Sequence, residues 1–147
     1  MGSNLISSTL DACRSAIAVF KDRRRSRLAR RDFWTLGMEE RTGMLNGIGM
    51  SPSEFDDAMH RPYAAQDFLT LAMRSVGIDP DSFHTLEFAH DQFMHRTCIT
   101  CLHRRRCHAH LEAFDFESHY REFCPNRDNF SELLRQRMRC LAGRRSS

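Results

Sequence analysis

The sequence lacks a long run of apolar residues. Its opening stretch, residues 5–20, is interrupted by Asp11 and Arg14, whereas a helix needs roughly 20 apolar residues to span a bilayer. The stretch also lacks the basic start, unbroken apolar core and small-residue cleavage site of a secretory signal. We therefore expect no membrane span and a cytoplasmic protein with reduced thiols, while an Arg- and Ser-rich organellar targeting peptide stays open.

Motifs of the common enzyme classes are also absent. The chain contains no Gly-rich phosphate loop, no His-Glu-x-x-His and no Gly-x-Ser-x-Gly, which serve phosphate binding, zinc hydrolysis and acyl transfer in known enzymes. Asp91 or Glu87 could act beside a metal with an open coordination position, but four cysteine ligands leave none. The sequence therefore predicts a protein that is not an enzyme and indicates no small-molecule substrate.

No segment alternates apolar and polar residues as a strand does, whereas apolar residues recur at helical spacing almost everywhere. This pattern predicts an all-α fold. With 147 residues, 41% of them hydrophobic, the chain can form one modest domain with an adjoining arm. We expect an arginine-rich helical arm with a helix-turn-helix corner over residues 1–60, a four-cysteine helical domain over residues 61–143 and a disordered tail over residues 144–147.

Capping residues and glycines set the expected helix bounds. A long N-terminal helix should begin at Ser8 or Thr9 and run into the arginine run. A last helix should extend from a capping box, Asn129 with Glu132, to Gly143. The helices expected between these two cover residues 33–45, 63–76, 80–95 and 116–123.

Two stretches repeat the same signals for ending one helix and starting the next. Gly49 and Gly77 each close a helix, because glycine accepts the left-handed backbone of a helix end. Ser51 and Asp79 follow as caps, each directly before a proline in the first turn of the next helix. Two such corners are too few for a repeat array and indicate two helical turns built from the same chemistry.

Four of the six cysteines form a C-x2-C-x5-C-x16-C array, whereas Cys13 and Cys140 stand alone and are interpreted as ordinary thiols. The array consists of Cys98, Cys101, Cys107 and Cys124. Thiolates are soft ligands, and such an array in a chain without secretory features indicates metal coordination rather than disulfides. Structural zinc usually uses two short knuckles and only one is present here, which favours a [4Fe-4S] cluster over Zn²⁺.

The first three cysteines resemble the clustered ligands of WhiB-like regulators and endonuclease III glycosylases. Those [4Fe-4S] proteins place their fourth cysteine before the triplet, so only the logic of cluster binding is shared. Seven of the eight histidines fall between residues 84 and 119, and His103, His108 or His110 is an alternative ligand that could replace a cysteine. An all-cysteine shell is favoured, since four thiolates complete a tetrahedral or cuboidal site.

The C-terminal part of the chain resembles an uncharacterised bacterial four-cysteine family. The family pattern is a Gly-[Val/Ile]-Asp-Pro corner, then Cys-x2-Cys-x5-Cys, then Phe-Cys-Pro-Asn, and the chain supplies it from Gly77 to Asn126. The resemblance covers about residues 63–141. It implies that the four cysteines belong together, and it brings no settled activity.

Arginines crowd the N-terminal part although the net charge is only +3. The run consists of Arg23, Arg24, Arg25, Arg27, Arg30 and Arg31. A helix that carries it can contact several phosphates, with an affinity that falls with salt, but no aromatic residue interleaves the run for base stacking. The alternative partner is an acidic surface, either residues 53–92 of the same chain or another protein.

The arginine run followed by Leu45-Asn-Gly-Ile-Gly-Met-Ser51 is similar to the YjiS-like family of small arginine-rich bacterial proteins. Some members of that family are implicated in RNA binding, so the resemblance implies RNA more than DNA as the partner. Together these features predict a small metal-centred regulatory or sensor protein with a basic arm for nucleic acid. The alternatives are a structural-zinc protein-interaction module without a redox role and an electron-transfer protein.

Overall fold

The computed structural model describes residues 2–86 and 88–145, and every secondary-structure element in these two ranges is an α-helix. The prediction of an all-α fold is confirmed. No helix in the described ranges is long and apolar enough to cross a membrane.

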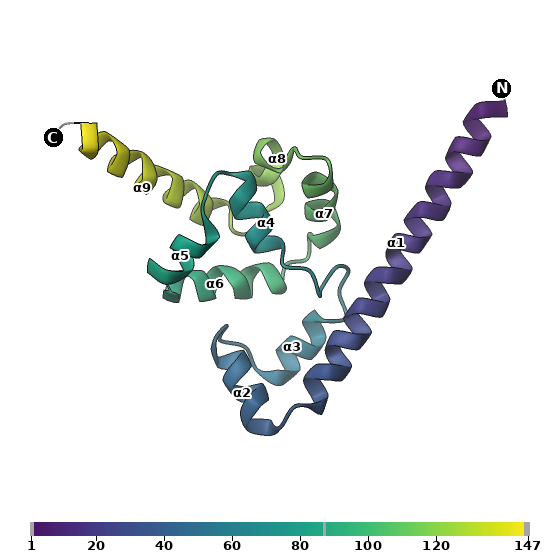
Figure 1. Cartoon of the computed structure of the whole chain (residues 1–147), viewed down its shortest axis with the longest axis horizontal. Coiled ribbons are helices and arrows are strands. Elements are labelled where there is room, and N and C mark those ends of the chain that lie inside the picture. The colour runs from purple at the N-terminus through teal and green to yellow at the C-terminus, as the bar shows by residue number, and fades with distance from the viewer. Residues whose placement is uncertain (1, 87, 146–147) are drawn as a thin grey trace.

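The N-terminal helix, α1 (Gly2–Thr35), is the longest element, and its first half extends away from the rest of the chain (Figure 1). Ser8 and Thr9 lie inside α1, so the prediction that one of them caps it is wrong. No proline interrupts residues 2–35, and the helix therefore continues upstream of both residues. Its apolar residues Leu10, Ile17, Phe20 and Leu28 are all exposed.

The helix predicted over residues 33–45 is divided between two elements. Phe33 belongs to the end of α1, and α2 (Met38–Asn46) starts only after Gly37. Gly37 has an extended backbone, and its N–H donates to the carboxylate of Glu40 at 3.2 Å. Since that side chain satisfies an otherwise unpaired donor, the chain can leave one helix and start another at this point.

The two predicted corners are confirmed. Gly49 and Gly77 have φ angles of 67° and 82°, in the left-handed region that glycine enters without a steric penalty. The hydroxyl of Ser51 accepts a hydrogen bond from the Glu54 N–H at 3.2 Å and caps α3 (Pro52–Ala58). The Asp79 carboxylate accepts from the Asp81 N–H at 3.3 Å at the start of α5 (Pro80–Leu86).

The helix predicted over residues 63–76 begins later than expected, as α4 (Phe68–Ser75). The Asp67 carboxylate caps it by accepting from the Thr70 N–H at 3.1 Å, and the residues before Asp67 form turns. The helix predicted over residues 80–95 is described as α5 and α6 (Phe88–Ile99), on either side of residue 87.

Three helices follow: α7 (Arg104–Glu112), α8 (Phe116–Phe123) and α9 (Arg127–Arg145). The bounds of α8 are as predicted. The predicted bounds of the last helix are wrong, because Asn129 lies inside α9 and donates to the Asn126 side chain at 3.0 Å. Gly143 also lies inside α9, which continues through Arg145, since this glycine does not take the left-handed backbone of Gly49 and Gly77.

Two hydrophobic clusters organise the described structure. The first joins Phe33 of α1 to α2 and α3 through Leu45, Met50 and Ala58. The second lies among α4 to α9 and includes the buried rings of Phe68, Phe116, Tyr120 and Phe130. In Figure 1, α2 and α3 form a layer below α4 to α8, while α9 extends to the left, away from α1, and the termini lie far apart.

Contacts across this boundary hold the two clusters together. Ile99 of α6 packs against the first cluster. Arg96 forms an ion pair with Glu54 at 3.0 Å, and Arg61 donates a hydrogen bond to the Thr100 carbonyl. The C-terminal half of α1 is thereby placed beside the end of α6 and the segment that carries the first cysteines.

Candidate metal centre and nucleic-acid interface

The four cysteines of the array line one cavity. Cys98 comes from α6, Cys101 from the turn after it, Cys107 from α7 and Cys124 from the end of α8. Most of the other lining is apolar and includes Phe68, Phe116, Phe123 and Phe130. The open space between the side chains is about 20 Å³, about the room that one water molecule needs.

The cysteine sulfurs are neighbours but are not in van der Waals contact as a group. In the described ranges, no three of the cysteine sulfurs all lie within 4.8 Å of one another. The one group of three potential ligand residues in these ranges that meets this distance contains no cysteine. A tetrahedral zinc site, with Zn–S bonds of about 2.3 Å, places its sulfurs about 3.8 Å apart. No three of the four sulfurs therefore lie as close together as they do around a single bound zinc ion.

Burial governs the acidity of these thiols. Burial raises the pKa of Cys98 and of Cys107 to about 12, and the neighbouring cysteines add to both shifts. Burial raises the pKa of Cys124 to about 11. The metal-free thiols of Cys98, Cys107 and Cys124 are therefore protonated at neutral pH, and a metal must displace their protons in order to bind.

Backbone N–H groups point at two of the sulfurs. The N–H of His103 donates to Sγ of Cys101 at 3.2 Å. The N–H of Asn126 donates to the sulfur of Cys124, which opposes part of the rise in that pKa. Hydrogen bonds of this kind stabilise negative charge on a thiolate and tune metal–thiolate centres.

A buried arginine, Arg104, also lines the cavity and is only 2% exposed. Its guanidinium donates to the backbone carbonyls of Cys98 at 2.8 Å, Tyr63 at 2.7 Å and Gln66 at 2.8 Å, and lies 4.5 Å from the centre of the Phe68 ring. Nη1 is also 4.0 Å from Sγ of Cys98. Arg104 forms no ion pair with a carboxylate in the described part of the chain, so its charge is buried without an acidic partner.

The three alternative histidine ligands do not line the cavity. His103 precedes α7 and is exposed. His108 stacks on Tyr63 with ring centres 3.9 Å apart and lies 3.7 Å from the Glu112 carboxylate. His110 stacks on Phe123 with ring centres 5.4 Å apart, and Phe123 separates it from the cavity that this ring lines.

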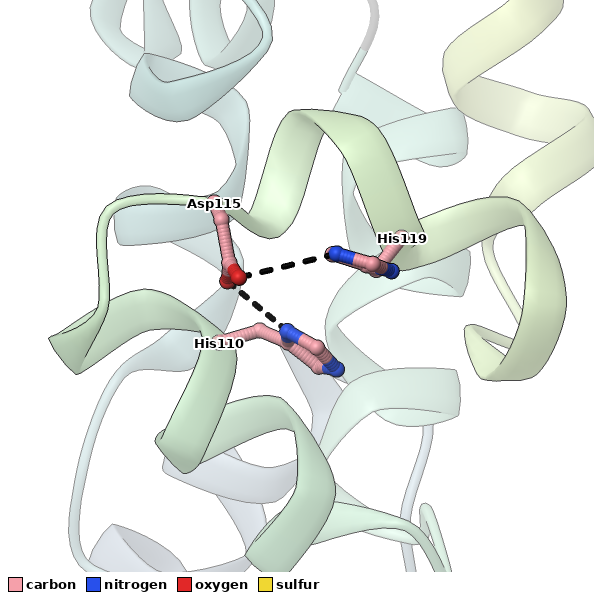
Figure 2. Close-up of side chains that lie close together, drawn as sticks. All are labelled: His110, Asp115 and His119. Carbon is pink, nitrogen blue, oxygen red and sulfur yellow. Dashed lines mark hydrogen bonds and ion pairs between the residues drawn. The ribbon is translucent and has the colours of Figure 1, made fainter.

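A second group of ligand atoms lies beside His110. Figure 2 shows the Asp115 carboxylate facing both His110 of α7 and His119 of α8, with one ring nitrogen of each histidine directed at it. Nδ1 of His110 is 2.8 Å from Asp115, and Nε2 of His119 is 3.5 Å from its other oxygen. All three residues are half-buried, and nitrogen and oxygen donors of this kind suit a single zinc ion.

The arginine run is divided between two surfaces. Arg23, Arg27 and Arg30 share one face of α1, because they are four and three residues apart, and they line a cleft of about 370 Å³. Arg61 and Arg105 line it from other segments. Arg24, Arg25 and Arg31 are exposed and do not line this cleft.

Two buried polar side chains lie along the same cleft. Asp22 and Ser26 are each 8% exposed and both belong to its lining. Oδ2 of Asp22 accepts a hydrogen bond from the Tyr63 N–H at 2.8 Å. Oδ1 of Asp22 and Oγ of Ser26 are buried and have no hydrogen-bond partner in the described structure.

Sequence reasoning missed three features of these sites: Arg104, Tyr63 and the pair formed by Asp115 and His119. Arg104 lies three residues before Cys107, so both occupy one face of α7, and that spacing was a usable signal. Asp115 and His119 are four residues apart across the start of α8 and were detectable in the same way. Nothing local indicates Tyr63, because its partners Asp22 and Arg104 are far away in the sequence.

Comparisons with protein-family models, curated proteins and solved structures found no match to this chain.

Proposed function

We propose that this chain is a small cytoplasmic regulatory or sensor protein that holds a [4Fe-4S] cluster and binds nucleic acid, RNA in preference to DNA, through its arginine-rich helix. The observation that carries the proposal is the pairing of four cysteines with the buried Arg104 around one cavity. The reducing cytoplasm keeps such thiols available for a metal.

The charge of the cavity supports a metal–thiolate centre. An isolated buried cation is unfavourable unless a nearby negative charge compensates it. Four thiolates outweigh the positive charge of a zinc ion or of a [4Fe-4S] core, so either centre is anionic. Arg104, 4.0 Å from Sγ of Cys98 and without a carboxylate partner in the described ranges, is the matching positive charge.

The spacing of the sulfurs does not match a closed zinc tetrahedron, and a cluster also requires them to move. Each thiolate of a cubane binds a different iron, so the sulfurs stand farther apart than the roughly 3.8 Å of a zinc tetrahedron. No three cysteine sulfurs in the described structure lie within 4.8 Å of one another. A zinc ion would draw them together by about 1 Å or more, whereas a cluster, which exceeds the free space of about 20 Å³, would turn them outward.

Loss of the cluster under oxygen, iron shortage or nitric oxide provides the regulatory step. After cluster loss Cys98, Cys107 and Cys124 would be protonated thiols, and the positive charge of Arg104 would no longer be compensated. Since the four sulfurs come from α6, the turn after it, α7 and the end of α8, these helices would loosen. The segment at Tyr63 beside the arginine-rich helix would change with them.

The test is purification of the full chain without oxygen, followed by iron, sulfide and zinc analysis. We expect a coloured protein with about four irons and four sulfides per chain, as a [4Fe-4S] cluster requires. Cys107→Ser and Cys124→Ser should lose the iron. Cys13→Ser and Cys140→Ser are the matched controls, because both residues are exposed on α1 and α9, and they should keep it. A colourless protein with stoichiometric zinc would eliminate the redox sensor.

A zinc-stapled interaction module is the second candidate function. The observation that favours it is the group formed by His110, Asp115 and His119, whose ligand atoms lie close enough together for one ion. An ion there would join α7 to α8 directly. In this role the metal stabilises the helices and the basic surface binds an acidic protein.

A further inference from the structure

The cleft on α1 is lined by arginines from three separate segments of the chain. Its arginines come from α1, from the turn after α3 and from α7. They are Arg23, Arg27, Arg30, Arg61 and Arg105. Asp22 is the one acidic residue in the described lining.

Not all of these charges are free to meet a ligand. Arg30 forms an ion pair with Asp56 at 3.1 Å, and Arg61 donates to the Thr100 carbonyl. Arg23, Arg27 and Arg105 are exposed and form no ion pair in the described part of the chain. Three exposed cations without an ion pair in the described residues therefore line one cleft, which is a site for an anion with several acceptor oxygens.

The unpartnered oxygens of Asp22 and Ser26 indicate that a ligand of this cleft should also carry a hydrogen-bond donor. A buried acceptor without a donor is destabilising, and these two lie one helical turn apart on the face of α1 that lines the cleft. Both are covered in the described structure, so a ligand reaches them only after a side chain at the mouth turns outward. Arg23 and Arg27, long and unpaired, have that freedom. The cleft thus combines cations at its mouth with acceptors below them.

We infer that this cleft binds the sugar–phosphate backbone of single-stranded RNA, with the phosphate on Arg23, Arg27 and Arg105 and the ribose 2′-hydroxyl on Asp22 and Ser26. The inference rests on the proposed function and assigns its nucleic-acid contact to one site. A cleft of about 370 Å³ has the size of a small-ligand pocket and holds about one nucleotide, not a duplex. The 2′-hydroxyl is a donor that DNA lacks.

The cleft reads the backbone rather than the base. Tyr63 is the one Phe, Tyr or Trp in the described lining, but its ring already stacks on His108 with ring centres 3.9 Å apart and planes within 4°. His60 also lines the cleft, and its Nδ1 lies 2.7 Å from the Asp56 carbonyl oxygen. A base therefore finds only the small His60 ring, without the paired aromatic platforms of sequence-reading RNA-binding proteins. Binding should depend on the sugar and on salt and only weakly on sequence.

The test is fluorescence anisotropy of the full chain with a labelled single-stranded oligoribonucleotide, the deoxy oligonucleotide of the same sequence and a ribonucleoside monophosphate as competitor. Arg27→Gln with Arg105→Gln should reduce the slope of log K against log salt by about 1.4, since each single-strand phosphate contact contributes about 0.7. Arg24→Gln with Arg31→Gln is the matched control with the same change in charge outside the cleft, and its slope should change less. Ser26→Ala should reduce the affinity for RNA about three- to tenfold and leave that for DNA unchanged.

The outcomes separate this inference from the proposed function. If the two double arginine variants weaken RNA binding equally, the cleft is not the binding site, although the helix still binds nucleic acid. The same conclusion follows if RNA and DNA bind with equal affinity and Ser26→Ala changes neither affinity. A wild-type protein that binds neither oligonucleotide at low salt would overturn both. Circular dichroism of each variant verifies that it is folded.

Discussion

The guanidinium of Arg104 donates a hydrogen bond to the backbone carbonyl of Tyr63 at 2.7 Å. The same guanidinium donates to the Cys98 carbonyl at 2.8 Å, and the Tyr63 N–H donates to Asp22 of α1 at 2.8 Å. Tyr63 has a φ of 56°, a left-handed backbone that is uncommon outside glycine, and both of its backbone polar groups are held. One buried side chain thus connects the cysteine cavity with the basic cleft.

Arg104→Met tests whether the buried guanidinium compensates a negative centre. The substitution keeps an unbranched side chain but removes the charge and the hydrogen bonds to three carbonyls. We expect the metal-loaded protein to lose about 3–5 kcal/mol of unfolding free energy, the range for removing one partner of a buried ion pair, and to retain less metal. The metal-free protein should lose less, because it has no anionic centre to compensate.

Urea unfolding with and without metal measures both quantities. Arg105→Met is the control, since Arg105 is exposed and adjacent in the sequence. Equal losses of stability in the two metal states would mean that Arg104 acts through its hydrogen bonds alone.

The stability of the metal-free protein should fall as the pH rises above about 9. Burial raises the pKa of Cys98 and Cys107 to about 12 and that of Cys124 to about 11, from an ordinary value of 9.0. Between these values the unfolded chain releases protons that the folded chain keeps, so the free energy of unfolding decreases with pH. In the metal-loaded protein the thiols are already deprotonated, and acid rather than alkali should weaken metal binding.

The measurement is the urea midpoint of the metal-free protein from about pH 8 to about pH 10.5. A variant with serine at positions 98, 107 and 124 is the control, because it lacks the titrating thiols but keeps the other alkaline groups. An identical slope in this variant would assign the pH dependence to those other groups.

Local chemistry predicted part of the fold well. The corners at Gly49 and Gly77 and the bounds of α8 followed from glycine, proline and capping residues within a few positions of each helix end. The starts at Ser8 and Asn129 were wrong, because each residue has the composition of a cap but sits in a chain that is already helical. A cap signal does not exclude a helix that begins upstream.

The sites were predictable only where their residues are close in sequence. The spacing of the four cysteines led to one hypothesis about one centre, and all four line one cavity, whereas the metal itself stays a prediction. Tyr63 was missed because its hydrogen bonds with Arg104 and Asp22 join segments that only tertiary packing brings together. The cleft was missed for the same reason, since Arg61 and Arg105 meet α1 from distant parts of the sequence.

The metal-loaded protein should bind one additional zinc ion at His110, Asp115 and His119. Their ligand atoms all lie within 4.8 Å of one another, and zinc can replace the hydrogen bond between His110 and Asp115. Asp115→Asn removes the anionic ligand and should weaken this zinc about ten- to a hundredfold, by analogy with the loss of other metal-supporting groups. Calorimetric zinc titration measures the change.

Glu112→Gln is the control for that titration, because Glu112 lies nearby and contacts His108 instead. The iron content of both variants should be unchanged. If zinc affinity is the same in Asp115→Asn and in the wild type, the group of His110, Asp115 and His119 is an ordinary hydrogen-bonded network and not a zinc site.

Asp56→Asn should loosen α1 from α3. Oδ1 of Asp56 accepts from the Trp34 indole at 3.0 Å and from Arg30 at 3.1 Å, and these two groups, in that order, hold the pKa of Asp56 below its ordinary value. The stabilisation is therefore present above about pH 4 and is lost as the pH falls through the lowered pKa. Because the carboxylate is partly exposed, we expect a loss of about 1 kcal/mol or less.

Urea unfolding at neutral pH and in acid measures this loss. Asp57→Asn is the matched control, since Asp57 is exposed and its side chain forms no ion pair in the described ranges. The two variants should differ at neutral pH and converge in acid. Destabilisation by Asp57→Asn of the same size would remove the specific role of Asp56.

Metal removal should weaken RNA binding at the cleft through Arg104 and Tyr63. Arg104 holds the Tyr63 carbonyl and the Cys98 carbonyl at once, so a change at Cys98 alters the segment whose N–H holds Asp22. We expect the wild type to lose about fivefold or more in RNA affinity without metal, the lower end of typical coupling between sites. By linkage, saturating RNA should raise metal affinity by the same factor.

In Arg104→Met the two affinities should become independent, whereas in Arg105→Gln the coupling should persist although RNA binds less tightly. Coupling that survives intact in Arg104→Met would place the connection elsewhere, for example through the contact of Ile99 with the first cluster.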